Sequence, residues 1–312
     1  MKKILILTLL FVPLLMFGQN DIQLSQQFLS RMNYNPAATG ASNYLNAFLL
    51  GRQQWIGWKD APQTQLLNVH NYFDEINSGA GLIVSNDRIA FTSTINAKLD
   101  YAYHIHFENR SYLSLGLGAG IIYKNLDVNK LLTETGSAET DPTINSYMDR
   151  YKKVNPDFDF GIEYNTEFLQ VGASVTHLNL SPVNINNLQS GRHIYFYTKG
   201  TFNLHPNWKL SPAAVAHLNV WPIMQLDLNT IAYYRSRFWF GASVRVSDRF
   251  VLETCAGIVG LFVTDFLKLG YSYDYNPGPL KKYSGGSHEI MLGLRLGKGE
   301  ARYGIKTPRF FE

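Results

Sequence analysis

The feature that most constrains this chain is the alternation of apolar and polar side chains along nearly all of it. From Tyr44 onward the period is two rather than about 3.6, as expected of strands with one apolar face. Within 95–107, one face carries Ile95, Ala97, Leu99, Tyr101, Tyr103, Ile105 and Phe107, and the other carries Asn96, Lys98, Asp100, Ala102, His104 and His106. The segments 157–164, 237–246, 267–275 and 289–296 divide in the same way. We therefore expect an all-β fold.

Turn-forming clusters of Asn, Asp, Gly and Pro divide the chain into about fourteen strands, an even number typical of outer-membrane barrels. Long connections near 125–154, 178–192 and 276–286 follow odd-numbered predicted strands, whereas short turns follow even-numbered ones. Long loops at one rim and short turns at the other are the outer-membrane pattern. We predict a transmembrane antiparallel β-barrel over 44–296 with periplasmic termini, an extracellular loop near 125–154 and a carboxy-terminal periplasmic tail over 297–312.

A soluble β-sandwich also alternates, so the alternation alone does not place the chain in a membrane. Tyr and Phe are frequent at the ends of the apolar faces, as in the aromatic girdles of membrane barrels, and the opposite faces carry ionisable residues. So many strands in an exported chain would otherwise expose free edges and apolar patches. These features favour a barrel in lipid, with charged side chains facing the lumen at Lys98, Asp100, Asp159, Glu163, Arg245 and Asp274.

The amino terminus has the form of an export signal. Lys2 and Lys3 precede the apolar stretch 4–17, and Gly18 is a small residue at a predicted cleavage point. A retained anchor helix is the alternative, but the stretch is short for a membrane span and Pro13 interrupts it. We expect a signal peptide over 1–18, removed after Sec-type export, and location in the outer membrane.

Composition excludes several other classes of protein. A net charge of +4 offers little to a nucleic-acid backbone, so no nucleic-acid partner is expected. Cys255 is the single cysteine and cannot form an internal disulfide, and no Cys/His cluster has the sequence spacing of a structural zinc module. We expect no cofactor and no metal.

Motif-like strings do not define an enzyme. Gly116, Gly118 and Gly120 resemble a nucleotide-binding loop, but they share one strand face and no helix follows, so small residues lining a crowded lumen are favoured. His104 and His106 could grip a metal, but no third ligand is implied, and a solvated pair of lumen histidines is favoured. Ser287, His288 and Glu289 are neighbours on a strand and point to alternate faces, so they cannot form a relay.

The segment 19–43 resists a strand interpretation. It is rich in Gln and Asn and contains a turn-forming run from Asn35 to Gly40, in which Pro36 fixes the backbone. Two interpretations remain open: a periplasmic leader, or a plug folded into the barrel mouth. Shortly after it, Arg52, Gln53, Gln54, Trp55 and Trp58 crowd a strand end and could anchor at the membrane interface or hold such a plug.

These same residues carry a family resemblance. The runs are Gln23-Leu24-Ser25-Gln26-Gln27-Phe28, Asn35-Pro36-Ala37 with Gly40, Arg52-Gln53-Gln54-Trp55 with Ala61-Pro62, Gly270-Tyr271-Ser272-Tyr273-Asp274-Tyr275 and Ser287-His288-Glu289-Ile290-Met291-Leu292. Together they strongly resemble the PorP/SprF family of type IX secretion and gliding-motility outer-membrane proteins. The likeness spans nearly the whole mature chain, but the loop near 125–154 has no matching signature.

The resemblance implies a barrel without enzymatic activity that serves secretion, surface attachment or movement of a large exported adhesin. The implied partners are a peptidoglycan-binding lipoprotein and ring proteins of the type IX apparatus, or a cognate surface adhesin. The family-motif or partner-binding candidates are Gln23, Ser25, Gln26, Asn35, Pro36, Gly40, Arg52, Gln54, Trp55, His288 and Glu289. A competing hypothesis is an outer-membrane channel for small or hydrophobic solutes, similar to a fatty-acid transporter.

Overall fold

The computed structural model describes residues 21–42, 44–126, 153–179, 191–219, 224–247 and 250–297. The predicted signal peptide, most of the loop near 125–154 and nearly all of the carboxy-terminal tail lie outside the described residues. The strands are β1 (Leu45–Gln53), β2 (Gln63–Phe73), β3 (Ser78–Ile89), β4 (Thr92–His106), β5 (Tyr112–Leu126), β6 (Lys153–Asn165), β7 (Leu169–Thr176), β8 (His193–Gly200), β9 (Phe202–His205), β10 (Trp208–Asn219), β11 (Met224–Tyr234), β12 (Phe238–Val246), β13 (Leu252–Phe262), β14 (Leu267–Tyr275) and β15 (Ser287–Leu296). Short 3-10 helices are η1 (Gln27–Leu29), η2 (Arg31–Asn33), η3 (Pro36–Ala38), η4 (Asp74–Ile76) and η7 (Pro279–Lys282).

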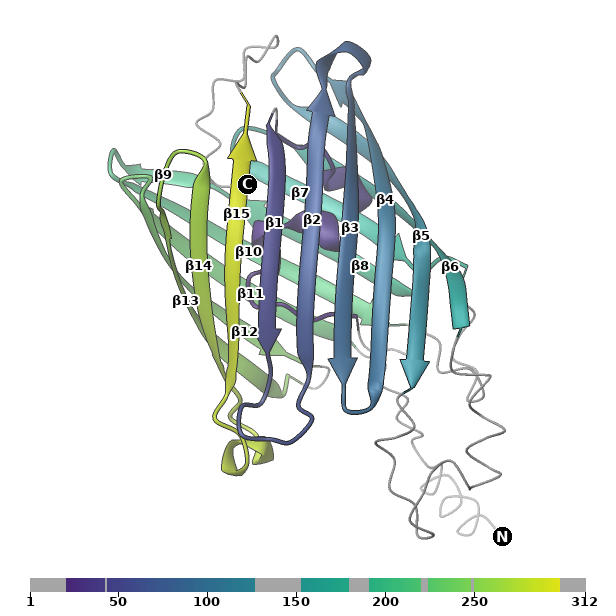
Figure 1. Cartoon of the computed structure of the whole chain (residues 1–312). Coiled ribbons are helices and arrows are strands. Elements are labelled where there is room, and N and C mark those ends of the chain that lie inside the picture. The colour runs from purple at the N-terminus through teal and green to yellow at the C-terminus, as the bar shows by residue number, and fades with distance from the viewer. Residues whose placement is uncertain are drawn as a thin grey trace, which may run out of the picture.

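The strands form one closed antiparallel barrel (Figure 1). β1 pairs with β15 from Leu45 opposite Leu296 to Gln53 opposite His288, which closes the wall. Both β8 and β9 pair with β10, one after the other along its length, so they act as one strand and the wall has fourteen. The predicted all-β barrel of about fourteen strands is therefore confirmed.

One predicted strand, over 193–204, is divided in the structure. The break lies at Thr201, whose backbone N–H donates to the Phe168 carbonyl in the turn between β6 and β7 at 2.8 Å. The pairing of β9 with β10 also shifts register between Trp208 and Lys209. This bond continues the register in which Leu169 pairs with Gly200, and β8 and β9 keep one register against β10 on both sides of Thr201, so the interruption is local.

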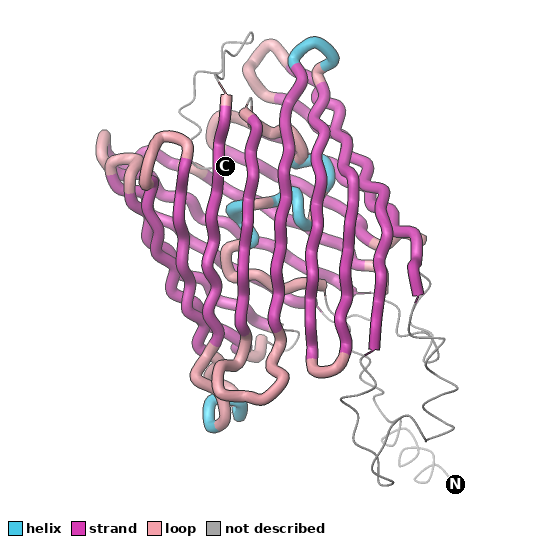
Figure 2. Tube along the Cα trace, in the orientation of Figure 1, coloured by secondary structure: helices cyan, strands magenta, loops and turns pink. Residues whose placement is uncertain are grey.

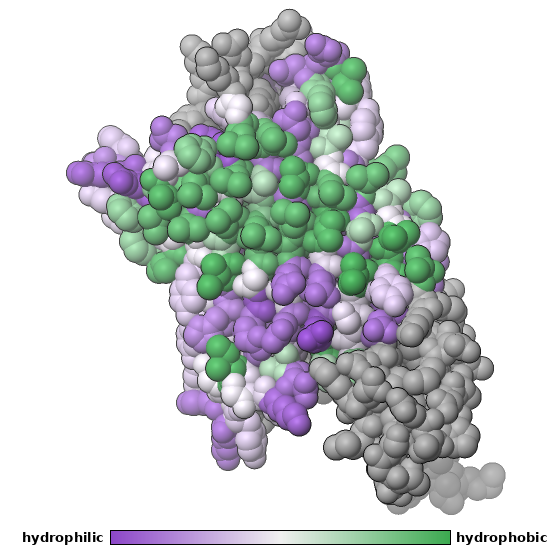
Figure 3. Space-filling view, viewed as in Figure 1, coloured by the Kyte–Doolittle hydropathy of each residue, from purple (hydrophilic) through white to green (hydrophobic). Residues whose placement is uncertain are grey.

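The two faces of the wall differ as the alternation predicts. Apolar side chains point outward at mid-strand, including Leu99 at 65% exposed and Leu117 at 61% exposed. Figure 3 shows them as a continuous hydrophobic band, with a hydrophilic zone between this band and the lower rim on the visible face. No helix in the described part of the chain is long and apolar enough to cross a membrane.

The two rims carry different connections (Figure 2). We call one the long-loop rim, because the connections 54–62 and 276–286 lie there and because β5 ends and β6 begins there. The other is the short-turn rim, where β2, β4, β6, β9, β11 and β13 each lead into the next strand. The side of the membrane that each rim faces stays a prediction.

Residues 21–42, which we call the plug, lie inside the barrel (Figure 1). The plug starts at the long-loop rim, where Asp21 contacts His177 after β7, and crosses to the short-turn rim, where β1 begins. Its apolar side chains form a core with inward-facing wall residues: Leu24, Phe28, Leu29 and Met32 pack with Leu50, Ile231, Trp239, Ile258 and Met291. The first described residue and the end of β15 therefore lie at opposite rims.

Candidate functional site

Arg52 on β1 lies at the centre of a cluster that grips the start of the plug. Its guanidinium donates to Asp274 at 2.6 Å, to Glu289 at 3.1 Å and to the Ser25 hydroxyl at 3.0 Å. The Ser25 hydroxyl in turn donates to Asp274 at 2.6 Å. Glu289 also accepts the backbone N–H groups of Ser25 and Gln26, each at 2.9 Å. Glu289 thus satisfies two plug backbone donors that would otherwise be buried without partners, and side chains from three neighbouring strands hold Ser25.

A second buried ion pair holds the middle of the plug. Arg31 donates through Nε to Glu163 on β6 at 2.9 Å, and the two side chains are 5% and 0% exposed. Glu163 also accepts from Asn165 at 2.8 Å and from the Tyr197 hydroxyl. Removing Arg31 would leave Glu163 charged and buried without its cation, which makes the pair costly to break.

A third cluster, on β11 and β12, contacts the plug near its first turn. Arg245 donates to Asp227 at 2.8 Å, to the Gln23 side chain at 3.2 Å and to the Leu24 carbonyl at 3.3 Å. Gln27 donates to the same carboxylate of Asp227. Charged wall residues therefore bind polar plug groups on several sides of the lumen.

The tight turn at 35–40 fits against glycines of the wall. The Asn35 side chain accepts from the Ala37 backbone N–H at 2.9 Å and caps η3, with Pro36 in its first turn. A Cβ at Gly161 would lie 1.8 Å from Asn35 Oδ1, and one at Gly116 would lie 2.1 Å from the Ala37 nitrogen. Gly40 has a φ of +72°, so its backbone conformation favours glycine.

Histidines bind the end of the turn. His104 Nε2 lies 3.0 Å from the Thr39 carbonyl oxygen and its Nδ1 lies 2.8 Å from the Ser114 hydroxyl, with 2% of the residue exposed. The expectation that His104 is solvated is therefore wrong, because the plug excludes water from its ring. The Gly40 backbone N–H donates to His70 Nδ1 at 3.0 Å.

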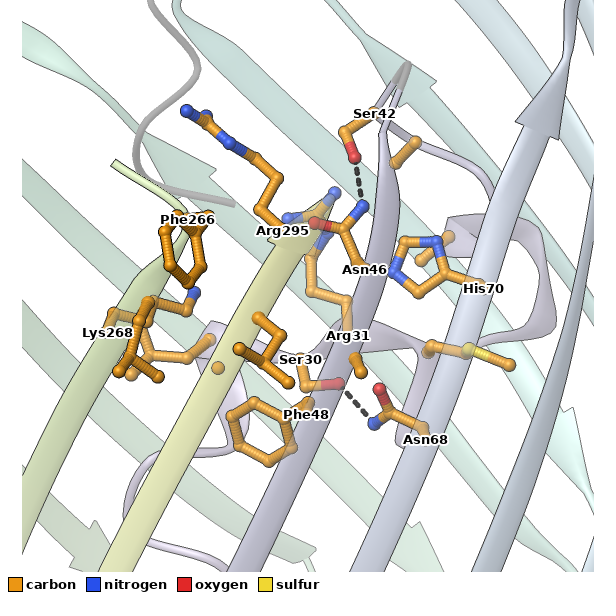
Figure 4. Close-up of a pocket in the computed structure, with 18 of the residues that line it drawn as sticks. Ser30, Arg31, Ser42, Asn46, Phe48, Asn68, His70, Phe266, Lys268 and Arg295 are labelled. Atoms are coloured by element: carbon orange, nitrogen blue, oxygen red, sulfur yellow. Dashed lines mark hydrogen bonds between the residues drawn. The ribbon is translucent and has the colours of Figure 1, made fainter. Parts of the chain in front are cut away.

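A cavity of about 60 Å³ remains beside the plug toward the short-turn rim (Figure 4). Ser30 and Arg31 of the plug face it, and Phe48, His70 and Lys268 face it from the wall. Asn68 donates to the Ser30 hydroxyl at 2.6 Å across its edge. The space is small, so the plug and wall remain in contact around it.

Asp21 meets an imidazole cluster at the long-loop rim. Its Oδ1 lies 2.9 Å from His177 Nε2, and His177 Nδ1 lies 2.8 Å from Asp157 Oδ1. Burial lowers the pKa of His177, but Asp21 and Asp157 outweigh this effect and raise that pKa to about 10. Burial likewise opposes ionisation of Asp21, whereas the facing histidines lower its pKa well below its ordinary value.

The six charged residues predicted to face the lumen are all buried, between 0% and 5% exposed: Lys98, Asp100, Asp159, Glu163, Arg245 and Asp274. Lys98 pairs with Asp159, whereas both carboxylate oxygens of Asp100 have no hydrogen-bond partner among the described residues. Five of the six therefore belong to ion pairs that cross between strands or reach the plug.

The partner-binding candidates do not form one site. Gln23, Ser25, Gln26, Asn35, Pro36 and Gly40 lie in the plug, and Arg52 and Glu289 hold it. His288 is separated from Glu289, since it contacts the Tyr271 hydroxyl at 2.6 Å on the other face of β15. Gln54 and Trp55 line a cavity of about 520 Å³ at the long-loop rim, together with Arg52, Arg245 and Asn276.

Sequence reasoning missed several residues that hold the plug. Asp227 and Tyr197 occupy inward positions of alternating strands, so periodicity could have identified them. Arg31 and Asp21 lie in the segment 19–43, which has no strand periodicity, and only the fold brings Arg31 to Glu163 and Asp21 to His177.

A closed wall with an apolar outer band, whose polar interior holds a segment of the same chain, defines a plugged β-barrel of the outer-membrane type. The chain belongs to the PorP/SprF family, because the family model described as "Type IX secretion system membrane protein PorP/SprF" matches residues 16–294. The resemblance in the sequence motifs is thereby confirmed.

Solved structures with a similar shape are distant in sequence. The outer membrane protein Omp33 of Acinetobacter baumannii is 10% identical, with a TM-score of 0.48 over 82% of this chain and 100% of that chain. A variant of the Rh. blastica porin is 9% identical, with a TM-score of 0.41 over 81% and 99%. The KdgM porin is 8% identical, with a TM-score of 0.40 over 81% and 99%. No curated protein matches the chain.

Proposed function

We propose that this barrel is a scaffold of the type IX secretion and gliding-motility machinery. In this proposal it resides in the outer membrane after removal of its signal peptide, and it supports secretion or surface attachment of a large exported adhesin. Its work is binding and positioning rather than bond chemistry. The observation that carries the proposal is the plug, which lies across the lumen and is held by buried ion pairs such as Arg31 with Glu163.

The two rims suit two kinds of partner. The long-loop rim has the cavity lined by Gln54 and Trp55, which offers polar and aromatic groups to an adhesin at the cell surface. The short-turn rim would then face the periplasm and the machine components there, a peptidoglycan-binding lipoprotein and ring proteins. A wall held rigidly by closure and by the plug keeps both surfaces in a fixed relation.

Surface display of the exported adhesin tests this proposal. Deleting the gene should abolish display, measured as protease-accessible adhesin on intact cells, and the wild-type chain should restore it. A Gln54→Ala/Trp55→Ala double variant should restore display poorly and should no longer co-purify with the adhesin from detergent-solubilised membranes. Phe250→Ala is the matched control, since Phe250 is 81% exposed near the same rim and does not line the cavity. Unchanged display in the deletion strain contradicts the scaffold proposal.

The second candidate function is a channel for small or hydrophobic solutes. The cavity of about 520 Å³ at the long-loop rim favours it, because such a volume could receive a small ligand. Steady conductance of the wild-type protein in planar bilayers, or solute uptake lost on deletion while adhesin display persists, would support the channel over the scaffold.

A further inference from the structure

The first residue of the plug lies among potential metal ligands contributed by the wall. Asp21 meets His177, which follows β7, and His193, which begins β8. One carboxylate oxygen and one ring nitrogen from each histidine all lie within 4.8 Å of one another. Asp21 Oδ1 is 2.9 Å from His177 Nε2 and 3.9 Å from His193 Nε2. Two imidazoles and one carboxylate form a donor set that divalent transition metals, zinc above all, commonly use.

Each of the three side chains is held from behind by another polar group. His177 Nδ1 lies 2.8 Å from Asp157, and His193 Nδ1 lies 2.7 Å from His217 Nε2. The second oxygen of Asp21 accepts from the Tyr195 hydroxyl at 2.7 Å. Such outer partners fix the tautomer of a metal-binding histidine, leaving its other ring nitrogen free to bind the ion. The same arrangement here aims both Nε2 atoms at Asp21 Oδ1.

Two buried atoms in this cluster have no hydrogen-bond partner among the described residues. They are His193 Nε2 and Asp157 Oδ2, and both residues are 0% exposed. A buried polar atom without a partner is destabilising, and an ion is one of the groups that can satisfy it. The His193 nitrogen is the stronger indication of the two, because it lies 3.9 Å from Asp21 Oδ1, too far for a hydrogen bond.

A neighbouring combination of Asp157, Asp159 and His177 is less suited to a metal. Asp159 already pairs with Lys98 and accepts the His177 backbone N–H at 3.0 Å. Asp21, by contrast, is 26% exposed in its side chain and lines the cavity of the long-loop rim, so an ion can reach it.

We propose that Asp21, His177 and His193 bind one divalent transition metal ion, zinc being the best match, and that the ion fastens the start of the plug to β7 and β8. This metal site goes beyond the proposed scaffold function, and neither proposal depends on the other.

Zinc titration of the full chain tests the site. Tag-free protein in detergent is treated with EDTA, freed of chelator and titrated calorimetrically with zinc sulfate. We expect one zinc ion per chain and its loss in His193→Asn and in Asp21→Asn. His217→Asn should weaken binding by about 10–100-fold, because it removes only an outer partner. His205→Asn is the control, since His205 is exposed at the end of β9, outside the cluster.

A second readout covers variants that fail to fold. The wild-type chain loaded with cobalt should show ligand-field absorption of a nitrogen-ligated site, and zinc should slow proteolytic cleavage of the plug. Heat-dependent migration in gels verifies that each variant is a closed barrel. Absence of stoichiometric zinc binding by folded wild-type protein would overturn the proposal, as would equal zinc affinity in folded His193→Asn and His205→Asn.

Discussion

At the scale of single residues, the interior of this barrel is a set of charges whose partners come from distant parts of the chain. Arg31 and Glu163 are 132 positions apart, and Ser25 and Asp274 are 249 apart. Alternation assigns a residue to one face of its strand, but it assigns no partner. The sequence therefore indicates inward charges such as Glu163 and Asp274, whereas the pairs depend on strand order and on a plug that has no periodicity. His104 is an example. Alternation predicts that it faces inward, but its burial depends on the plug, which contacts it at Thr39.

Breaking a buried pair should cost far more than breaking an exposed one. Arg31→Ala leaves Glu163 buried without its cation, and we expect a loss of about 3–5 kcal/mol in the free energy of unfolding. Arg110→Ala removes a pair with Glu167 whose side chains are 61% and 50% exposed, and should change that free energy by about 0–1 kcal/mol. Denaturant unfolding in detergent measures both, and equal losses would contradict the role assigned to Arg31.

At the scale of elements, the plug has little regular structure of its own and depends on the wall. Its 3-10 helices are three residues long, and the Glu289 carboxylate of the wall accepts the backbone N–H groups of Ser25 and Gln26. Glycines at 79, 116 and 161 leave room for its turn. The sequence indicated the turn at Pro36 and left open whether the segment is a periplasmic leader or a plug in the barrel mouth. Local signals could not decide, because the path of the plug is determined by contacts on most sides of the lumen.

Replacing the plug with a flexible linker should open the barrel. We expect a chain in which 21–42 is an equally long Gly/Ser sequence to conduct ions steadily in planar bilayers, because such a linker cannot bury apolar side chains or pair with the wall charges. The wild-type chain should conduct much less under the same conditions. Gly257→Ala, at a wall position where a Cβ meets nothing within 4 Å, controls for mutation of the barrel itself. Equal conductance of wild type and linker variant would contradict an occluding plug.

At the scale of the whole molecule, two features define the barrel: the β1–β15 pairing that closes the wall and the apolar band on its outer face. Most strands carry their own alternation and many turns carry Asn, Asp, Gly or Pro, so strand number and barrel class could be predicted from local sequence. The break at Thr201 was not predicted, because the strands on either side of it keep one register against β10. The β1–β15 seam likewise joins segments that lie far apart along the chain.

A charge in the outer band should weaken the barrel according to its depth. Leu117 lies mid-strand on β5 and is 61% exposed, so Leu117→Arg should destabilise the lipid-embedded barrel by about 2–4 kcal/mol. Ile76→Arg is the matched control, because Ile76 is 57% exposed in η4 at the short-turn rim and should cost about 0–1 kcal/mol. Reversible unfolding in lipid vesicles measures the difference, and equal costs would contradict the membrane position of the band.

The path of the plug has a consequence for the order of assembly. Residues 21–42 precede β1 in the chain, yet they span the lumen that β1 and β15 close last in sequence. If the wall closed first, the plug would have to enter the lumen afterwards. The buried wall charges would lack their plug partners until it did. We therefore expect residues 21–42 to be in place inside the forming barrel before β1 pairs with β15, so that the later strands assemble around them.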